Sequence, residues 1–147
     1  PADSVAGQAA RAIRSSTSDF FVLRERQAHH IARWAEWFGK FDILICPVSM
    51  TPAFPHQNKD GDGPIPSMAR TLTVGNRQVP YLENLLWSGV ATLAHLPATA
   101  RPLPKGVGDL PAGIQFIGPS YGDRTTLAFS ALCDEVFGTF TPPPGFD

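Results

Sequence analysis

The chain has 147 residues, with 12 Lys plus Arg, 13 Asp plus Glu and a formal net charge of -1. This balance excludes a broad basic face, so we expect neither nucleic acid nor a membrane among the partners. No apolar run reaches the ~18 residues of a membrane span, and no basic start leads into an apolar segment, so neither a membrane helix nor a signal peptide is expected.

A short polar helix is predicted first, over residues 2–14, and the run of Ser and Thr at 15–18 ends it. Ser18 or Thr17 is expected to cap the next helix, because these side chains accept hydrogen bonds from the first backbone amides. Asp19 would then lie favourably at the positive end of the helix dipole.

The second helix, over residues 18–38, is the clearest element of the sequence. Apolar residues recur there at steps of three and four, which places them on one helix face. Gly39 is expected to stop the helix in a left-handed conformation. The shared face consists of Phe20, Leu23, Gln27, Ile31, Trp34 and Phe38.

A strand is predicted over residues 42–46, with Pro47 at its end. It is apolar almost throughout, which is typical of a strand buried on both faces, as in a parallel sheet. The loop that follows, over residues 49–67, is rich in Pro and Gly. Asp60 and Asp62 at its most polar point are interpreted as solvated turn residues rather than as an acid–base pair.

A small hairpin and a helix are predicted next. The segments 71–74 and 77–79 flank Gly75-Asn76, a pair suited to a tight primed turn. Pro80 then opens a helix from about Tyr81 to His95.

Two more strands and a final helix complete the pattern, over residues 97–103, residues 112–117 and from Asp123 onward, with Asp123 as the cap. The glycine-rich segment 105–109 leads into a strand rather than a helix, so it predicts a plain turn and not a phosphate loop. The alternation of helices and strands predicts an α/β fold. Three main strands are few for a self-sufficient sheet, so we expect the sheet to be completed by something outside this chain.

Both cysteines, Cys46 and Cys133, lie in apolar stretches. We interpret them as buried reduced thiols of a cytoplasmic protein. A disulfide between them stays open, because the sequence does not show the geometry that such a bond requires.

No local motif for catalysis or metal binding is present. Gly-x-Ser-x-Gly is absent, and Ser88 is expected mid-helix, where its hydroxyl can bond back to a carbonyl. His29 and His30 are adjacent on one helix and would point about 100° apart, which prevents easy sharing of one ion. No His-Glu-x-x-His or Cys-x-x-Cys occurs, so neither a metal nor a cofactor is expected.

Several segments, in their order and spacing, resemble the amidase signature family. Trp37 to Pro47 is similar to a helix end followed by a strand closing on Pro, and residues 51–56 to the loop after it. Residues 81–87 lead to Leu96 to Thr99, which resembles the family's Gly-Leu-Pro-Ala segment. The most specific match is Asp109 to Pro119, similar to Gly-Leu-Pro-x-Gly-x-Gln-x-x-Gly. The resemblance covers about four-fifths of the chain.

The resemblance implies a large α/β enzyme with part of a mixed β-sheet flanked by α-helices. It also implies a Ser nucleophile, a second Ser in a cis peptide and a Lys as ultimate base, in upstream segments. No two glycines are adjacent here, and the lysines Lys40, Lys59 and Lys105 all lie in expected turns or loops. No catalytic residue is therefore carried over. His95, where the family has Gly, and Asp109, where it has Gly, are departures.

What the resemblance does carry over is a pocket wall. In related enzymes the helix matching residues 81–87 and the loop after the first strand border the acyl-binding cleft, so the expected substrate-binding residues are Phe54, Tyr81, Asn84 and Trp87. The alternative is core packing for Phe54 and Trp87, and capping or surface positions for the other two. An amide with an apolar acyl or aryl part is the expected substrate.

We expect residues 1–147 to be the C-terminal part of a single amidase domain, inactive alone and marginally stable in isolation; a start at Pro1 instead of Met fits a fragment. Its expected partners are a small-molecule amide, in the complete enzyme, and the missing N-terminal part of the same fold; a homo-oligomer stays open. Two alternatives remain: a non-catalytic truncated paralogue or subunit that binds a partner through an open sheet edge, and a stand-alone hydrolase.

Overall fold

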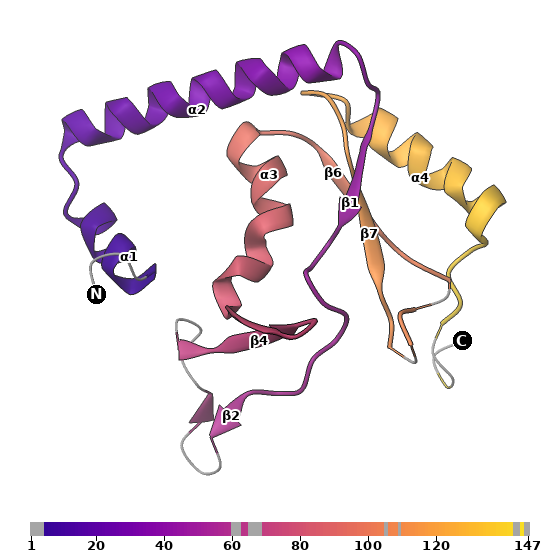
Figure 1. Ribbon diagram of the computed structural model, residues 1–147. Coiled ribbons are helices and arrows are strands. Elements are labelled where there is room, and N and C mark those ends of the chain that lie inside the picture. The colour runs from indigo at the N-terminus through magenta and orange to yellow at the C-terminus, as the bar shows by residue number, and fades with distance from the viewer. Residues whose placement is uncertain are drawn as a thin grey trace.

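A three-stranded sheet lies at the centre of the structure, a computed structural model that describes residues 5–59, 63–64, 69–104, 106–108, 110–142 and 145 (Figure 1). Its strands are β1 (Leu44–Pro47), β7 (Gly113–Ile117) and β6 (Ala98–Pro102), in the order β1-β7-β6. Both neighbouring pairs are antiparallel. The α/β class predicted from the order of elements is confirmed.

The environment predicted for the first strand is wrong in two respects. β1 is an edge strand among the described residues, and its only described pairing, with β7, is antiparallel. Ile45 is 55% exposed, whereas Cys46 beside it is buried at 5%. The run of apolar residues predicts burial on both faces, but the described part of the chain covers only one of them.

The two faces of β7 contact different helices, which gives three layers. Phe116 packs edge-on against Phe129 of α4 (Asp123–Phe137), with ring centroids 5.0 Å apart. Ile117, the next residue, points to the opposite face. There it joins Ala91 of α3 (Leu86–Ala94) and Cys46 in a buried cluster. The sheet is therefore the middle layer between α4 and α3 (Figure 1).

Helix α2 (Thr17–Phe38) crosses one end of these layers, and α1 (Val5–Ile13) precedes it (Figure 1). The boundaries predicted for both helices are close to the observed ones. Gly39 is not left-handed as predicted: its φ is -69° and its ψ is -12°, and its amide donates to carbonyls of the last helical turn. No residue of α2 is buried in this chain.

The cap of α2 is Ser16, one residue before the predicted Thr17 or Ser18. Ser16 Oγ accepts from the Asp19 amide at 3.1 Å, and the Asp19 carboxylate accepts from the Ser16 amide at 2.9 Å. This reciprocal pair is a capping box. The bonds from the Ser16 backbone and side chain lower the pKa of Asp19.

We expect Ser16→Ala to lower the free energy of unfolding by about 1 kcal/mol, because the Asp19 amide loses its acceptor. Asp19→Asn should destabilise at neutral pH, since the native carboxylate accepts two hydrogen bonds. A lowered folded-state pKa means that this contribution is present above the unfolded pKa and is lost as pH falls through the folded one. The stabilities of wild type and Asp19→Asn should therefore begin to converge as pH falls below the ordinary Asp value of 3.8 and coincide only below the lowered folded-state pKa. A difference that persists there would contradict the capping role.

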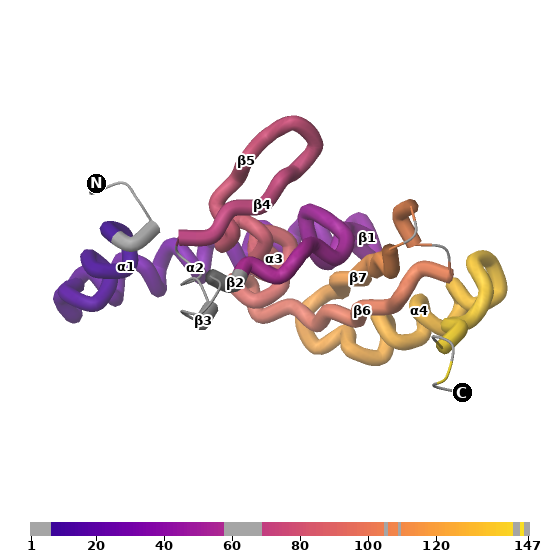
Figure 2. The backbone as a smooth tube through the Cα atoms, turned by 90° about the horizontal axis from the view of Figure 1, so that it is seen from below, coloured from indigo at the N-terminus to yellow at the C-terminus, as the bar shows by residue number. Residues whose placement is uncertain are grey.

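The hairpin and the helix after it are confirmed. β4 (Thr71–Val74) pairs with β5 (Arg77–Pro80) across Gly75, whose φ is 58°. The predicted helix begins with a 3-10 segment, η2 (Tyr81–Leu85), before α3. Figure 2 shows this hairpin projecting from the side of the molecule.

His95 ends α3 in the left-handed conformation, with a φ of 57°. The amidase signature family usually has Gly at this position. Gly adopts the left-handed conformation without the steric penalty of a side chain, which gives a physical reason for that preference.

Smaller differences concern a loop and a cap. Two short strands, β2 (Asn58–Lys59) and β3 (Gly63–Pro64), pair within the predicted loop. The cap of α4 is Gly122 rather than Asp123, and no side chain bonds its first amides. The predicted turn residues Asp60, Asp62, Lys105 and Asp109 and the Pro143-Pro144 tail lie outside the described residues.

Cys46 and Cys133 are both buried and not joined by a disulfide, as interpreted from their sequence context. Within the described ranges, no helix has the length and apolar character needed to cross a membrane.

Candidate functional site

The loop after β1 is fixed by the side chain of Asn84, one of the predicted site residues. Asn84 Oδ1 accepts a hydrogen bond from the Met50 amide at 2.9 Å. Ser49 Oγ donates to the Thr51 carbonyl within the same loop. The structure therefore places Asn84 under the loop, as a residue that holds its backbone in position.

Phe54 and Tyr81 form an aromatic pair where this loop meets η2. Their ring centroids lie 5.9 Å apart at an interplanar angle of 81°, an edge-to-face geometry that aromatic rings favour. The Arg70 guanidinium lies 5.4 Å from the centre of the Tyr81 ring. Phe54 is 38% exposed, so one of its sides remains available for contact. Two predicted site residues are thus neighbours in space although 27 positions separate them in the sequence.

An open groove of about 820 Å³ runs between the loop after β1 and the β6–β7 hairpin. Its apolar lining includes Val48, Met50, Phe54, Leu103 and Ile114. A second hollow of about 590 Å³ lies on the other side of the loop, next to β4, and Phe54 borders it too. The loop therefore separates a mainly apolar groove from a second hollow whose lining also includes the polar residues Gln57, Thr71 and Gln78.

The Thr51 hydroxyl is a polar group that the sequence reasoning missed. Thr51 borders both hollows, and its Oγ1 is a buried atom without a hydrogen-bond partner within the described structure. A buried hydroxyl without a partner costs free energy, so a ligand or another protein segment that bonds to it would be favoured. No sequence pattern distinguishes this Thr from an ordinary loop residue.

Trp87 lies away from the groove lining. It is half-buried and packs against the cluster of Cys46, Ala91 and Ile117 at the sheet. This is the core-packing alternative considered for Trp87. A direct contact with substrate, for Trp87 and for the other three residues alike, stays a prediction.

The segment with the most specific resemblance to the amidase signature family, around β7, serves packing and hydrogen bonding in this structure. A Cβ on Gly113 would lie 3.0 Å from the Arg101 carbonyl oxygen, and one on Gly118 would lie 2.7 Å from Thr126 Cγ2. Gln115 is buried at 5% exposure, and its Nε2 donates to the Pro47 carbonyl at 3.0 Å. The two glycines allow close packing. Gln115 links β7 to the start of the loop after β1, residues 48–54, which borders the groove and is called the groove loop from here on.

The titratable groups near this loop offer no acid–base pair among the described residues. Burial raises the pKa of the Cys46 thiol, and a hydrogen bond with the Gln115 side chain opposes this rise. The thiol is therefore protonated at neutral pH and a poor nucleophile. Ser88 Oγ donates to the Leu85 carbonyl at 3.0 Å, as expected for a helix hydroxyl.

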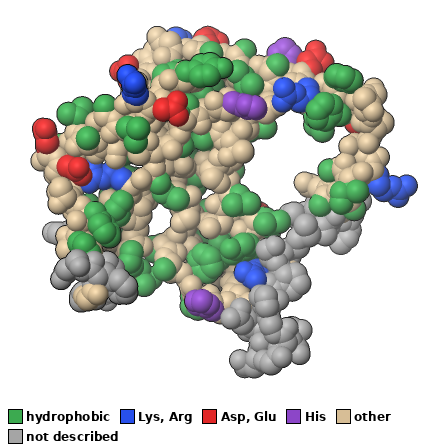
Figure 3. Space-filling view, turned by 180° about the vertical axis from the view of Figure 1, so that it is seen from behind, with side chains coloured by type: hydrophobic (Ala, Val, Ile, Leu, Met, Phe, Trp, Pro, Cys, Tyr) green, Lys and Arg blue, Asp and Glu red, His purple; other side chains and the backbone are tan. Residues whose placement is uncertain are grey.

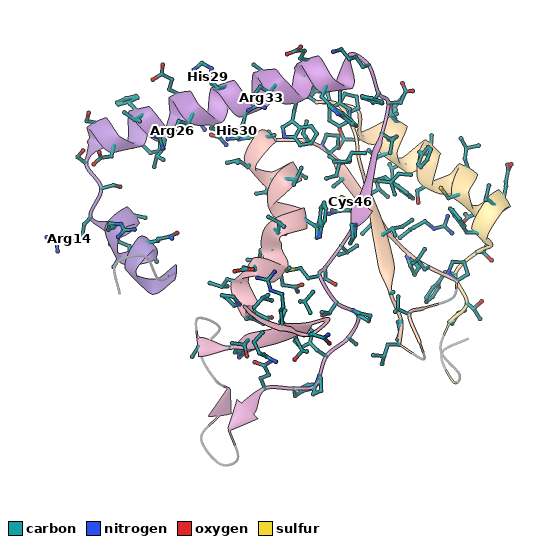
Figure 4. The ribbon with its side chains drawn as sticks, viewed as in Figure 1. Arg14, Arg26, His29, His30, Arg33 and Cys46 are labelled. Carbon is teal, nitrogen blue, oxygen red and sulfur yellow. The ribbon has the colours of Figure 1, made fainter. Side chains whose placement is uncertain are left out.

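Metal binding finds no site in the described part of the chain, where no three His, Cys, Asp or Glu side chains come close enough to hold an ion. Figure 4 draws His29 and His30 on different sides of α2, as their adjacent positions require. Neither histidine is near the groove loop.

The comparison with known proteins agrees with this architecture. The Amidase family model matches residues 5–127, so the chain belongs to the amidase family. This confirms the resemblance inferred from the motifs.

Similar curated proteins are named as the A subunit of glutamyl-tRNA(Gln) amidotransferase. The protein of Treponema denticola is 31% identical over 100 residues, which is 68% of this chain and 18% of the relative. The protein of Nitrobacter hamburgensis is 28% identical over 101 residues, which is 69% of this chain and 18% of the relative. The protein of Bradyrhizobium diazoefficiens is 24% identical over 127 residues, which is 84% of this chain and 23% of the relative. The matched region therefore spans about a fifth of the length of these relatives.

Proposed function

We propose that this chain is the C-terminal part of an amidase domain that hydrolyses carboxylic amide C–N bonds. The observation that carries the proposal is the amidase family match over residues 5–127. The family mechanism uses a Ser nucleophile, a bridging Ser and a Lys base, and we place all three upstream of this chain. The role of this chain in the complete enzyme is then to shape the binding site. The chain alone is inactive.

The groove loop is the part of this chain that we assign to substrate binding. Phe54, supported by Tyr81, offers an apolar and partly exposed ring for an acyl or aryl group. Asn84 acts through the loop by holding the Met50 amide. Trp87 supports the same region from the core side.

A kinetic series on the complete protein, expressed from its full reading frame, tests this assignment. Phe54→Ala should lower kcat/KM for amides with long or aromatic acyl groups by about tenfold, and for acetamide by much less, because a lost apolar contact is worth about 1–3 kcal/mol. Phe41→Ala is the matched control, since Phe41 is 52% exposed and stacks on Trp37, away from the loop.

The dependence on acyl length decides the outcome. Equal losses for short and long acyl groups would remove Phe54 from the substrate site, and the same criterion applies to Trp87→Ala. A complete protein that cleaves no amide at all would favour the non-catalytic alternative.

The names of the relatives support a second candidate, a protein that works in amide transfer together with other subunits. The same preparation separates the two. Cleavage of simple amides by the purified complete protein alone supports the hydrolase. Activity that requires glutamyl-tRNA(Gln) and a further subunit supports the transferase.

A further inference from the structure

Helix α2 packs mainly against α3, and a polar junction joins the two helices where α3 ends. Gln27 Nε2 donates to the Leu93 carbonyl at 2.8 Å and lies 2.9 Å from His95 Nε2. Leu93 lies in the last turn of α3, where carbonyls have no partner within the helix, so Gln27 supplies one. Figure 3 shows open space between the N-terminal half of α2 and the body of the molecule. This junction is therefore the place where that half of the helix is fastened.

The other contacts of Gln27 fix the direction in which its amide group points. The Arg24 guanidinium has donors only, so the oxygen that it contacts must be Gln27 Oε1. The Leu93 carbonyl has acceptors only, so the nitrogen Gln27 Nε2 must donate to it. His95 Nε2 then faces an amide N–H and must accept a hydrogen bond from it. The ring can do so only when it is neutral, with its proton on Nδ1.

Protonation of His95 would leave this junction without an arrangement that satisfies all its groups. A charged imidazole has a donor on each nitrogen, so its Nε2–H would point at the N–H of Gln27. Turning the Gln27 amide over would offer His95 an acceptor. The amide nitrogen would then face Arg24, and the amide oxygen would face the Leu93 carbonyl. Because His95 is exposed, the charged ring can instead leave the junction for water.

We propose that this junction is a pH-sensitive contact between α2 and α3. The hydrogen bond from Gln27 to His95 is present while the ring is neutral and is lost when the ring takes up a proton. The backbone φ of 57° at His95 adds a second observation, because a side chain in this conformation costs free energy that its contacts must offset. α3 directly follows η2, which carries Tyr81 and Asn84, so the contact determines how firmly α2 is held to the helix behind the groove loop.

The charged groups around His95 do not compensate a proton on its ring. α2 contributes Arg24 and His30, each three residues from Gln27, and Figure 4 draws His30 on the side of α2 toward α3. α3 and residues 96–97 contain no Asp, Glu, Lys or Arg. No carboxylate among the described residues lies within ion-pair distance of His95. A charged ring would therefore stand near the positive charge of Arg24 with no anion beside it.

Hydrogen exchange in the complete protein, expressed from its full reading frame, tests the proposal. Protection factors divide out the direct effect of pH on exchange chemistry and report local opening. From about pH 8 to about pH 5, the range in which histidine changes charge, protection of residues 91–97 should fall about fivefold, the factor expected for one hydrogen bond. His95→Asn, which tolerates the left-handed backbone but does not titrate, should show no fall. His30→Asn is the matched control and should respond as the wild type does.

Gln27→Glu should reverse the response, because a carboxylate accepts a hydrogen bond from a charged ring and offers none to a neutral one. Protection in this variant should rise as pH falls. Equal responses of wild type and His95→Asn would overturn the proposal, and so would a fall in Gln27→Glu.

Nitrogen NMR of the wild type labelled with ¹⁵N-histidine gives a second readout that needs no altered stability. The resonances of His95 are identified by their loss in His95→Asn and in His95→Gly. We expect an unprotonated Nε2 at about pH 8, since that atom accepts from Gln27. A proton on Nε2 at that pH would contradict the junction as described. Neither measurement uses catalysis, so the proposal and the proposed function can fail separately.

Discussion

Replacement of Phe116 by Ala is expected to lower the free energy of unfolding by about 3–5 kcal/mol, the usual range for removing a buried Phe from a core. Phe116 has 0% exposure in β7, the middle strand of the sheet, where it packs edge-on against Phe129. Truncation would leave a cavity between the central strand and α4, because both strands that flank β7 keep the backbone from closing it. Urea denaturation of the wild type and the variant measures the loss.

Two further variants separate the packing of Phe116 from a general effect of losing an aromatic ring. Phe116→Leu keeps most of the volume and should cost less than about 1.5 kcal/mol. Phe137→Ala removes a ring that is 50% exposed at the end of α4, and it should be nearly neutral. A Phe116→Ala variant as stable as Phe137→Ala would show that β7 and α4 do not form the main core layer.

Local patterns in the sequence were sufficient to predict most elements. The step of three and four in α2, the Gly75 turn and the Pro80 start are short-range signals, and the structure has an element at each of them. The environment of β1 was predicted less well. Strand pairing depends on partners that are distant in the chain. An apolar run such as Leu44–Cys46 therefore does not reveal whether residues of this chain pack on both faces of the strand.

The sequence indicated which residues to consider for the candidate site, but not how they are arranged. The motif resemblance indicated Phe54, Tyr81 and Asn84, and the structure brings all three to one loop. The motif resemblance did not reveal that Asn84 accepts a hydrogen bond from the Met50 amide, or that the Thr51 hydroxyl has no hydrogen-bond partner among the described residues. Both facts depend on the path of the loop backbone.

Replacement of Arg101 by Ala is the second change for which we expect a large loss, of about 2–4 kcal/mol, because hydrogen bonds to a charged group are each worth about 1.5–3 kcal/mol. Arg101 lies on β6 with 7% exposure. Its guanidinium donates to the Asp134 carboxylate at 2.6 Å, the Gly138 carbonyl at 2.8 Å and the Ser130 carbonyl at 3.1 Å. One side chain thus fastens the C-terminal half of α4 to the sheet.

The carbonyl bonds, rather than the ion pair, should account for most of this loss. The Asp134 side chain is 46% exposed, and an ion pair with one solvated partner contributes about 0–1 kcal/mol. Asp134→Asn should therefore cost much less than Arg101→Ala, and the double variant should differ little from Arg101→Ala alone. Denaturation of all three decides the matter. An Asp134→Asn loss as large as that of Arg101→Ala would mean that the ion pair, and not the anchoring of the helix end, determines how α4 is held.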